Sequence, residues 1–492
     1  MFRPVLLSVL LTSSVFAQAA PSAQARIERR FAELRKSPPE LYAFLYKMPK
    51  GGDLHNHLSG AIYAESFLKA AAEDRLCIDK VALTIVPAPC KPDQVEAALA
   101  QTDNNLRNAM IDSLSMRNFV PGKQSGHDHF FATFDKFGAV GSSALMPEVI
   151  RRAADQNESY LELMALSGGG ALSELGQVVG LDDDFDVTRT KLEAGGFAPL
   201  VGELKTRVDQ LEQLRRRSLG CQGGPDTPAC KVQVHYVFQV LREFPKAQVF
   251  AQVMGGFALA ASDPRVVAVN FVQPEDGVTS MGDYHLQMRM VDYAKRIYPS
   301  VHITLHAGEL APGLVPPDGL LFHIREAVEL GHAERIGHGV DIMGEKDPEQ
   351  LLKEMHDRHV MVEINLTSND VILGIGGDAH PFPVYRKFGV PVALSTDDEG
   401  VSRGQLTDEY QRAVLTYKLT YAEIKEMVRN SLEYSFAPGL SYWAKGAYGT
   451  PVAACFASRQ SEGCKEYLHA NEKARIEEDL EERFADFEHG VR

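Results

Sequence analysis

The sequence predicts an α/β fold: a closed (β/α)8 barrel with a helical insertion after strand 1 and additional helices at the carboxyl terminus. Two observations carry this prediction. First, short apolar runs alternate with helical patterns from residue 159 onward, and eight such runs can be counted from the one that contains His55. Alternation implies parallel strand pairing, and eight units close a barrel. Second, imidazole and carboxylate groups follow four of these runs, where a parallel barrel places its catalytic groups.

The expected elements follow from the period of the apolar residues. A charged helix over residues 25–47 comes first, and Pro49-Lys50-Gly51-Gly52 ends it. The eight expected strands are the run around His55 and the runs at residues 160–166, 232–240, 265–272, 301–306, 335–338, 360–366 and 390–395. Helices are expected between them at 200–217, 247–260, 282–298, 320–330, 348–359 and 384–388, and after them at 406–436 and 462–488.

Residues 59–157 form a long excursion between the first two strands. They show no clear strand pattern, but helical patterns cover 64–73, 94–116, 130–137 and 145–154. A long excursion after a strand end usually forms a lid or a binding wall. The aromatic cluster at Phe130, Phe131 and Phe134 is either the apolar side of such a site or ordinary core. No linker or repeat divides the chain, so residues 26–492 are expected to form one barrel domain with a helical lid at about 59–157.

Composition and the amino terminus limit the partners and the compartment. The chain has 492 residues and a formal net charge of -15, which argues against nucleic acid because phosphate binding needs a basic patch. Residues 1–25 carry Arg3, an apolar run and then small residues, the pattern of a cleaved signal peptide; a membrane anchor is the alternative. No later segment approaches ~20 continuous apolar residues. We expect an exported protein, periplasmic or secreted, with no membrane contact after cleavage and an oligomeric state that the sequence leaves open.

The six cysteines form three pairs that are close in sequence. An even count in an exported chain favours disulfides, although six cysteines allow about 15 connectivities. None of the pairs has the C-x2-C spacing typical of a structural zinc site. We therefore predict the three local disulfides Cys77–Cys90, Cys221–Cys230 and Cys455–Cys464.

Four strand ends supply the groups of one polar site. These groups are His55, His57, His306, Glu309, His338, Asp397 and Asp398. Neutral imidazoles with one carboxylate suit Zn²⁺, which brings the pKa of a bound water toward ~7. A catalytic site keeps one coordination position open, so some of these groups must be acid, base or orienting groups. The expected strand at 265–272 has no lysine to bridge two metals, which favours a mononuclear site; buried histidines with backbone partners are the structural alternative.

Position in the sequence helps to sort these groups. His55 and His57 are two residues apart on a strand and share a face. Glu309 follows His306 by three residues, so it can lie beside the metal as a general acid and base. Asp397 and Asp398 on a strand end are expected to point to opposite sides, so that one binds metal while the other faces substrate.

The motifs resemble those of the adenosine deaminase family of the metal-dependent hydrolase superfamily. The resemblance is carried by residues 48–58, His306-Ala307-Gly308-Glu309, Arg335-Ile336-Gly337-His338-Gly339 and Ser395-Thr396-Asp397-Asp398, in family order, with support at 366–369 and 430–435. It covers roughly residues 48–436. The Lys50-Gly51-Gly52 lead-in and the export signal are similar to the secreted branch, the adenosine-deaminase-related growth factors.

The resemblance implies a role for each group. One Zn²⁺ per chain would be held by His55, His57, His306 and Asp397. Glu309 would protonate purine N1 and accept a proton from water, His338 would orient and polarise the hydroxide, and Asp398 would bond purine N7. The implied reaction is hydrolytic conversion of adenosine and deoxyadenosine to inosine-type products and ammonia. The cytidine-type pattern of zinc deaminases is absent.

Two positions depart from the family pattern. Gln273 stands where the deaminases have a glycine that approaches purine N3, and Ser59 stands where many members have an aspartate that contacts the ribose. These departures motivate an alternative substrate: a modified purine, a free base or another cyclic amidine. A third hypothesis is a non-catalytic, growth-factor-like binding protein, against which Glu309 argues because a binder needs no proton-transfer group.

Overall fold

The computed structural model describes residues 23–222, 227–445 and 447–490. Most of the predicted signal peptide, residues 1–22, lies outside the described residues. Residues 23–25 already belong to α1 (Ala23–Leu34). Among the described residues, no helix is long and apolar enough to cross a membrane.

Eight parallel strands form the barrel, as predicted. Their order in the sheet follows their order in the chain. Two backbone hydrogen bonds close the barrel between the first and last strands: His57 N–H donates to Asp397 O (3.1 Å), and Asp397 N–H donates to His55 O (2.8 Å). The strands are β1 (Gly51–His57), β5 (Glu158–Ser167), β6 (Gln233–Leu241), β7 (Val266–Val272), β8 (His302–Ala307), β9 (Arg335–His338), β10 (Met361–Ile364) and β11 (Val392–Leu394).

The barrel strands are apolar because both of their faces are covered. Every residue of β7 is buried, since one face fills the barrel and the other meets helices. α12 (Lys246–Ser262) packs on β6 and β7 and is in turn covered by α8 (Ala171–Val179), so it is apolar on most sides. Gly256 permits the approach to β6, because a Cβ there would lie 2.4 Å from Phe238.

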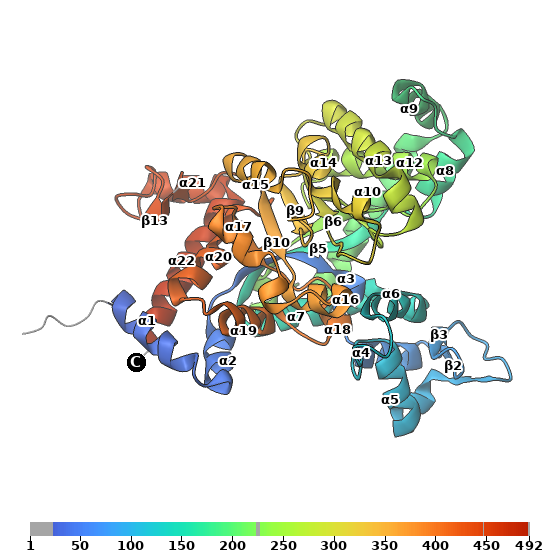
Figure 1. The fold of residues 1–492 in the computed structure, drawn as a ribbon, viewed down its shortest axis with the longest axis horizontal. Helices are drawn as coiled ribbons and strands as arrows, with labels where there is room; N and C mark the ends of the chain where they lie inside the picture. The colour runs from blue at the N-terminus through green and yellow to red at the C-terminus, as the bar shows by residue number, and fades with distance from the viewer. Residues whose placement is uncertain (1–22, 223–226, 446, 491–492) are drawn as a thin grey trace, which may run out of the picture.

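The remaining helices surround the barrel and follow its strands (Figure 1). Between β5 and β9 they are α9 (Phe185–Ala194), α10 (Phe197–Ser218), α11 (Pro228–Lys231), α13 (Val278–Ile297) and α14 (His323–Glu329). After β9 they are α15 (Pro348–Asp357), α16 (Leu366–Leu373), α17 (Phe382–Lys387), α18 (Glu399–Ser402), α19 (Leu406–Tyr417) and α20 (Tyr421–Glu433). The expected continuous helix at 406–436 is therefore wrong: the capping box of Thr420 and Glu423 starts a separate helix.

The insertion between β1 and β5 is not purely helical, which corrects the expectation. It contains a small antiparallel sheet of β2 (Cys77–Asp79), β3 (Thr84–Val86) and β4 (Gln94–Glu96). This sheet projects from the barrel (Figure 1). The expected helix at 94–116 is replaced by β4, a 3-10 turn and α5 (Asn104–Ser113), whose amino terminus is capped by Asp103. The other helices are α3 (Leu58–Ala61), α4 (Ala64–Glu73), α6 (Gly126–Phe137) and α7 (Met146–Asp155).

The first and last helices of the described residues pack together on one side of the barrel. The expected helix at 25–47 is two helices, α1 and α2 (Pro38–Lys47), because two prolines begin the second. Phe31 and Phe44 from these helices contact Tyr421 of α20. The carboxyl-terminal part adds the hairpin β12 (Trp443–Ala444) and β13 (Ala447–Pro451), then α21 (Glu462–Ala470) and α22 (Glu472–Gly490), where one helix was expected.

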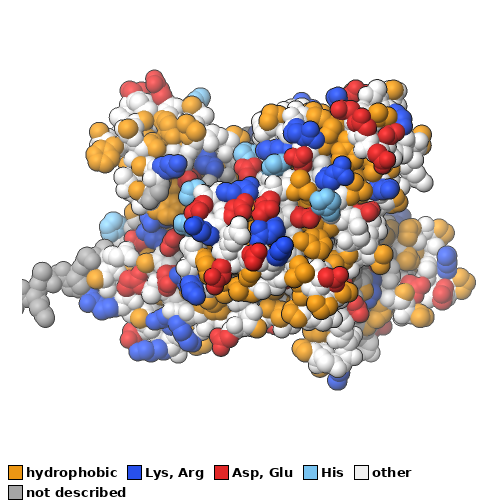
Figure 2. Space-filling view, turned by 45° about the horizontal axis from the view of Figure 1, so that its top comes forward, with side chains coloured by type: hydrophobic (Ala, Val, Ile, Leu, Met, Phe, Trp, Pro, Cys, Tyr) orange, Lys and Arg blue, Asp and Glu red, His pale blue; other side chains and the backbone are white. Residues whose placement is uncertain are grey.

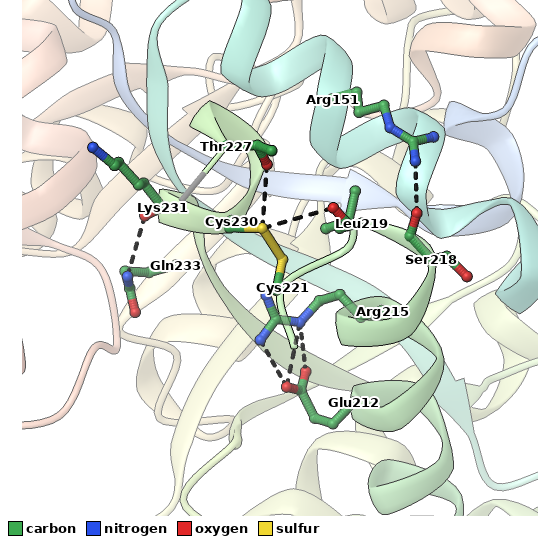
Figure 3. Close-up of a disulfide and its surroundings, with 10 residues drawn as sticks. All are labelled: Arg151, Glu212, Arg215, Ser218, Leu219, Cys221, Thr227, Cys230, Lys231 and Gln233. Carbon is green, nitrogen blue, oxygen red and sulfur yellow. Dashed lines mark hydrogen bonds and ion pairs between the residues drawn. A yellow bond between two sulfur atoms is a disulfide. The ribbon is translucent and has the colours of Figure 1, made fainter. Parts of the chain in front are cut away.

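The three predicted local disulfides are confirmed. Cys77 pairs with Cys90, Cys221 with Cys230 and Cys455 with Cys464. Figure 3 shows the second of these beside the carboxyl end of α10, where the Cys230 sulfur lies near Leu219 and Thr227. On the face drawn in Figure 2, acidic and basic side chains are interspersed.

Candidate active site

A cavity of about 650 Å³ opens at the carboxyl end of the barrel strands. Strand ends form one side of it, and α6 of the insertion forms another. Six of the seven predicted site residues line the cavity, and the seventh, His55, lies fully buried against them. The lining six are His57, His306, Glu309, His338, Asp397 and Asp398. The structure therefore brings together all the residues that the sequence nominated.

Three imidazoles and one carboxylate converge at the floor of the cavity. His306 Nε2 lies 3.1 Å from His55 Nε2 and 3.1 Å from His57 Nε2. Asp397 Oδ1 lies 3.4 Å from His55 Nε2 and 3.3 Å from His57 Nε2. His55 and His57 come from the end of β1, His306 from β8 and Asp397 from the loop after β11.

Each of these histidines has an acceptor at its other ring nitrogen. His55 Nδ1 lies 2.7 Å from Glu363 Oε2, His57 Nδ1 lies 3.3 Å from Gln239 Oε1, and His306 Nδ1 lies 3.0 Å from Asn270 Oδ1. Hydrogens placed on Nδ1 leave three Nε2 lone pairs directed at one another. Such lone pairs repel unless a cation lies between them, and second-layer acceptors of this kind orient metal-binding histidines. The donor set, three imidazoles and a carboxylate, fits Zn²⁺.

The pKa shifts of the cluster also favour a bound cation. Although burial opposes it, Asp397 and Glu363 raise the pKa of His55 to about 10. Against the same effect of burial, the contacts with His55 and His57 hold the pKa of Asp397 well below its usual value. Burial and the neighbouring imidazoles lower the pKa of His306, which keeps its lone pair free. Positive charge is therefore favoured between the two carboxylates, and a divalent cation would supply it in place of a proton.

His338 lies beside this cluster at the end of β9. Its Nε2 is 4.0 Å from Asp397 Oδ2 and has no hydrogen-bond partner among the described residues. Its Nδ1 faces the side-chain amide of Asn369 at 2.8 Å. Burial lowers the pKa of His338 to about 3, so the ring is neutral at neutral pH.

Glu309 lies next to His338, with its carboxylate 3.6 Å from His338 Nδ1. Burial and the charges of Asp397 and Glu275 raise its pKa well above the usual value. The Glu275 carboxylate fixes the loop by accepting the backbone N–H groups of Gly308 (3.0 Å) and Glu309 (2.7 Å). Gly308 has a φ of 75°, so the turn that presents Glu309 favours glycine.

Asp397 and Asp398 do not point to opposite sides, which corrects the expectation. β11 ends at Leu394, and Asp397 has a φ of 59°, so strand alternation no longer applies. Both carboxylates line the same cavity. Burial, together with the charge of Asp397, raises the pKa of Asp398 well above its usual value. A Cβ at position 60 would lie 1.6 Å from Asp398 Oδ1, so Gly60 leaves room for this side chain.

The wall opposite the histidines is aromatic. Phe130, Phe131 and Phe134 of α6 line the cavity, as expected if this segment bounds the site. Ser59 and Gln273, the two positions that depart from the family pattern, line it as well. Gln273 has a φ of 86°, and its side-chain oxygen accepts the backbone N–H of Glu243 at 3.0 Å.

Sequence reasoning did not identify the residues that orient the predicted ligands. Gln239, Asn270 and Glu363 each interrupt an otherwise apolar strand run, and that interruption was the available signal. Glu275 lies two residues after Gln273 and was assigned no role from the sequence. Asn369 belongs to a supporting motif to which no role was given.

Comparison with known proteins agrees with the resemblance of the motifs. A family model described as adenosine deaminase matches residues 219–441. The adenosine deaminase of Clostridium perfringens is 35% identical over 135 residues, which are 27% of this chain and 37% of that protein. The match thus spans little more than a third of that relative's length. The adenosine deaminase of Vibrio vulnificus is 24% identical over 392 residues, 78% of this chain and 93% of that protein.

Solved structures share the fold. Arabidopsis ADAL complexed with IMP aligns with a TM-score of 0.55 and 19% identity over 90% of this chain and 99% of that one. An adenine deaminase from Arthrobacter aurescens aligns with a TM-score of 0.51 and 16% identity over 88% and 98%. These solved structures share the barrel fold, and the sequence matches show that residues 219–441 are similar to the adenosine deaminase family.

Proposed function

We propose that this protein is a hydrolytic purine deaminase that converts adenosine and deoxyadenosine to inosine-type products and ammonia. One observation carries the proposal: the buried Glu309, whose pKa is raised, lines the cavity whose floor holds a cluster of three imidazoles and one carboxylate that fits Zn²⁺. Support also comes from the adenosine deaminases among its relatives.

The proposed metal ligands are His55, His57, His306 and Asp397, with one Zn²⁺ per chain. A Zn²⁺ ion held there supplies Lewis acidity that brings the pKa of a water toward ~7. Glu309 has a raised pKa, which favours its protonated form, and we propose that this form donates its proton to purine N1. His338, a neutral ring, orients the attacking water.

Asp398 would recognise purine N7. This ring nitrogen is a hydrogen-bond acceptor, which an ionised carboxylate would repel. The raised pKa of Asp398 favours its protonated form, whose hydroxyl can donate to N7. The aromatic side chains of α6 would cover the apolar faces of the substrate. Residues 59–157 would thus act as a lid over the site. We propose that this lid and the barrel form a single domain over residues 26–492.

The first prediction tests this assignment with Glu309→Gln. The substitution keeps the shape of the side chain but removes its transferable proton, so kcat should fall by about 10³-fold, within the range of general acid–base catalysis. The measurement is the absorbance change from adenosine to inosine, with ammonia release as a second readout. Zinc content should stay at one per chain. Failure of the zinc-loaded wild type to release ammonia from adenosine, deoxyadenosine or an N6-substituted analogue would refute the proposal.

The second prediction concerns phosphate. Some structural neighbours bind nucleotides, such as the Arabidopsis protein with IMP. Here no described lysine or arginine lines the cavity, and the exposed Asp128 and Asp135 stand at its edge. A nucleotide would therefore meet repulsion without a counter-charge.

We expect kcat/KM for adenosine to exceed that for AMP by about 10²-fold or more, a discrimination of about 2.7 kcal/mol. The double variant Asp128→Asn with Asp135→Asn should narrow this ratio at low salt and have little effect at high salt, where surface charges are screened. Asp186→Asn on α9 is the matched control. Equal rates for adenosine and AMP would contradict the nucleoside assignment.

The departures Gln273 and Ser59 favour one alternative, a deaminase of a modified purine, a free base or another cyclic amidine. A panel of these compounds under the same assay separates the two, because a strong preference for adenosine removes the alternative. We also propose that the protein is exported to the periplasm or secreted, since three disulfides form readily in oxidising compartments.

A further inference from the structure

A directional chain of hydrogen bonds leads from the backbone at Phe382 to the site. Phe382 N–H lies 3.1 Å from His380 Nδ1. A backbone N–H can only donate, so His380 Nδ1 accepts and carries no hydrogen. His380 is 2% exposed, and burial with the nearby charge of Arg412 lowers its pKa to about 4. The neutral ring therefore carries its hydrogen on Nε2.

The next link is Asn369, which is fully buried on α16. His380 Nε2 lies 3.0 Å from the side-chain oxygen of Asn369, which accepts its hydrogen. The orientation of the amide follows: its oxygen faces His380, and its nitrogen faces His338 Nδ1 at 2.8 Å. An amide nitrogen can only donate, so His338 Nδ1 accepts. The side-chain nitrogen of Asn365, 3.5 Å from the same Nδ1, is a weaker second donor.

The hydrogen of neutral His338 is thereby placed on Nε2, the atom that faces the metal cluster. This is the reverse of the arrangement in His55, His57 and His306, whose Nδ1 atoms face acceptors. His338 is one of the residues that converge as a possible metal-binding group with His55, His306 and Asp397, so distance alone does not separate it from the proposed ligands.

We propose that His380 and Asn369 are positioning residues that fix the Nε2–H tautomer of His338, making it a hydrogen-bond donor to the attacking water and excluding it from the metal. The inference deepens the proposed function and rests on it for the identity of the water, but the tautomer itself follows from contacts outside the metal cluster. The relay begins at a backbone N–H, which fixes the direction of every later link.

A matched pair of substitutions at His380 tests the direction of the relay. His380→Gln keeps a donor toward Asn369, whereas His380→Glu has nearly the same shape and only accepts. With glutamate, Asn369 would turn its nitrogen toward residue 380 and its oxygen toward His338, and the hydrogen of His338 would move to Nδ1. Asn369→Asp should have the same effect one link closer to the site.

Four measurements apply to each variant: kcat, KM, zinc content and the ¹⁵N resonances of the His338 ring in histidine-labelled protein. His338→Asn identifies the resonances. We expect His380→Gln to keep kcat within a few-fold, and His380→Glu and Asn369→Asp to lower it by about 10²-fold with little change in KM. Zinc should remain at one per chain. The ring resonances should report Nε2–H in the wild type and His380→Gln, and Nδ1–H in the other two.

Nδ1–H in the wild type would overturn the inference, as would equal loss of kcat in His380→Gln and His380→Glu. A fall in zinc content in step with kcat would assign His338 to the metal and overturn it too. If the folded glutamate and aspartate variants keep kcat and the Nε2–H tautomer, the relay does not set the tautomer. The resonances and the zinc content need no substrate, so they judge the relay even if the wild type deaminates no purine.

Discussion

At the scale of single residues, the site concentrates backbone conformations that side chains disfavour. Gln273, His338 and Asp397 all line the cavity and all have positive φ, at 86°, 69° and 59°. Such conformations cost about 1–3 kcal/mol each and persist where the surroundings impose them. In His338 and Asp397 the turn directs a side chain into the cluster. Gln273, which stands where the family pattern has glycine, holds a side chain in a conformation that glycine adopts without strain.

The third prediction separates the backbone of Gln273 from its side chain. Gln273→Ala keeps the positive φ and removes the bond to Glu243 N–H, so it should destabilise the protein by about 1 kcal/mol. Gln273→Gly removes the same bond but also the strain, so it should be about 1 kcal/mol more stable than Gln273→Ala. Chemical denaturation compares the two. Equal stability of the pair would show that the backbone at this position is not strained.

Both variants should also raise KM for adenosine several-fold at unchanged kcat, because Gln273 lines the cavity away from Glu309 and the metal ligands. Unaltered KM in both would place Gln273 outside substrate recognition. A rise in KM in Gln273→Gly alone would implicate the backbone turn and not the side chain.

At the scale of elements, the barrel strands were predictable because a parallel strand buried on both faces leaves an apolar run between turn residues. The three-residue strands β2, β3 and β4 are too short to show a period, and they were missed. Two other errors ignored visible signals: the prolines that begin α2, and the Thr420 capping box that begins α20. The helical pattern continues across both signals, so one helix was expected at each place where the structure has two.

The fourth prediction concerns α6, the element of the insertion that lines the cavity. His127 near its start lies 2.9 Å from Asp276 in the loop after β7 and 3.0 Å from Asp128. Although burial opposes it, these carboxylates raise the pKa of His127. A raised histidine pKa means that the stabilising contact is fully present below ~6.5 and is lost as pH rises through the higher, folded value.

Hydrogen exchange in α6, corrected for the intrinsic pH dependence, should therefore accelerate as the pH rises above ~6.5 and through the raised pKa of His127. His127→Gln should remove this change, since glutamine does not titrate. His285→Gln on α13 is the control, because the His285–Glu326 pair lies outside the insertion. If the hydrogen-exchange protection of α6 does not change as the pH rises, the ionic contact of His127 does not hold the helix in place.

At the scale of the whole molecule, the sequence indicated the first layer of the site but not the second. Histidines and carboxylates at strand ends are recognisable because a barrel gathers all strand ends at one rim. The groups behind them depend on which side chains face one another across strands. Arg335 illustrates this: its guanidinium binds Glu162 at 2.5 Å and Glu363 at 2.6 Å, and Glu363 in turn orients His55. That network requires the register of four strands, β1, β5, β9 and β10, which no local pattern contains.

The fifth prediction follows from the placement of the proposed metal ligands around the barrel. They come from β1, β8 and the loop after β11, and backbone hydrogen bonds between β1 and Asp397 in that loop close the barrel. A cation bound there stabilises the folded state by an amount that grows with its free concentration, about 2.7 kcal/mol at 100 times the Kd.

Chelation should therefore abolish activity and lower Tm by a few degrees, and added Zn²⁺ should restore both. The experiment omits reducing agents so that the disulfides stay intact. His306→Ala is the matched control, because a chain that has lost a central ligand should show a low Tm that chelators no longer change. If chelation changes neither Tm nor activity of the wild type, the cluster is not a functional metal site.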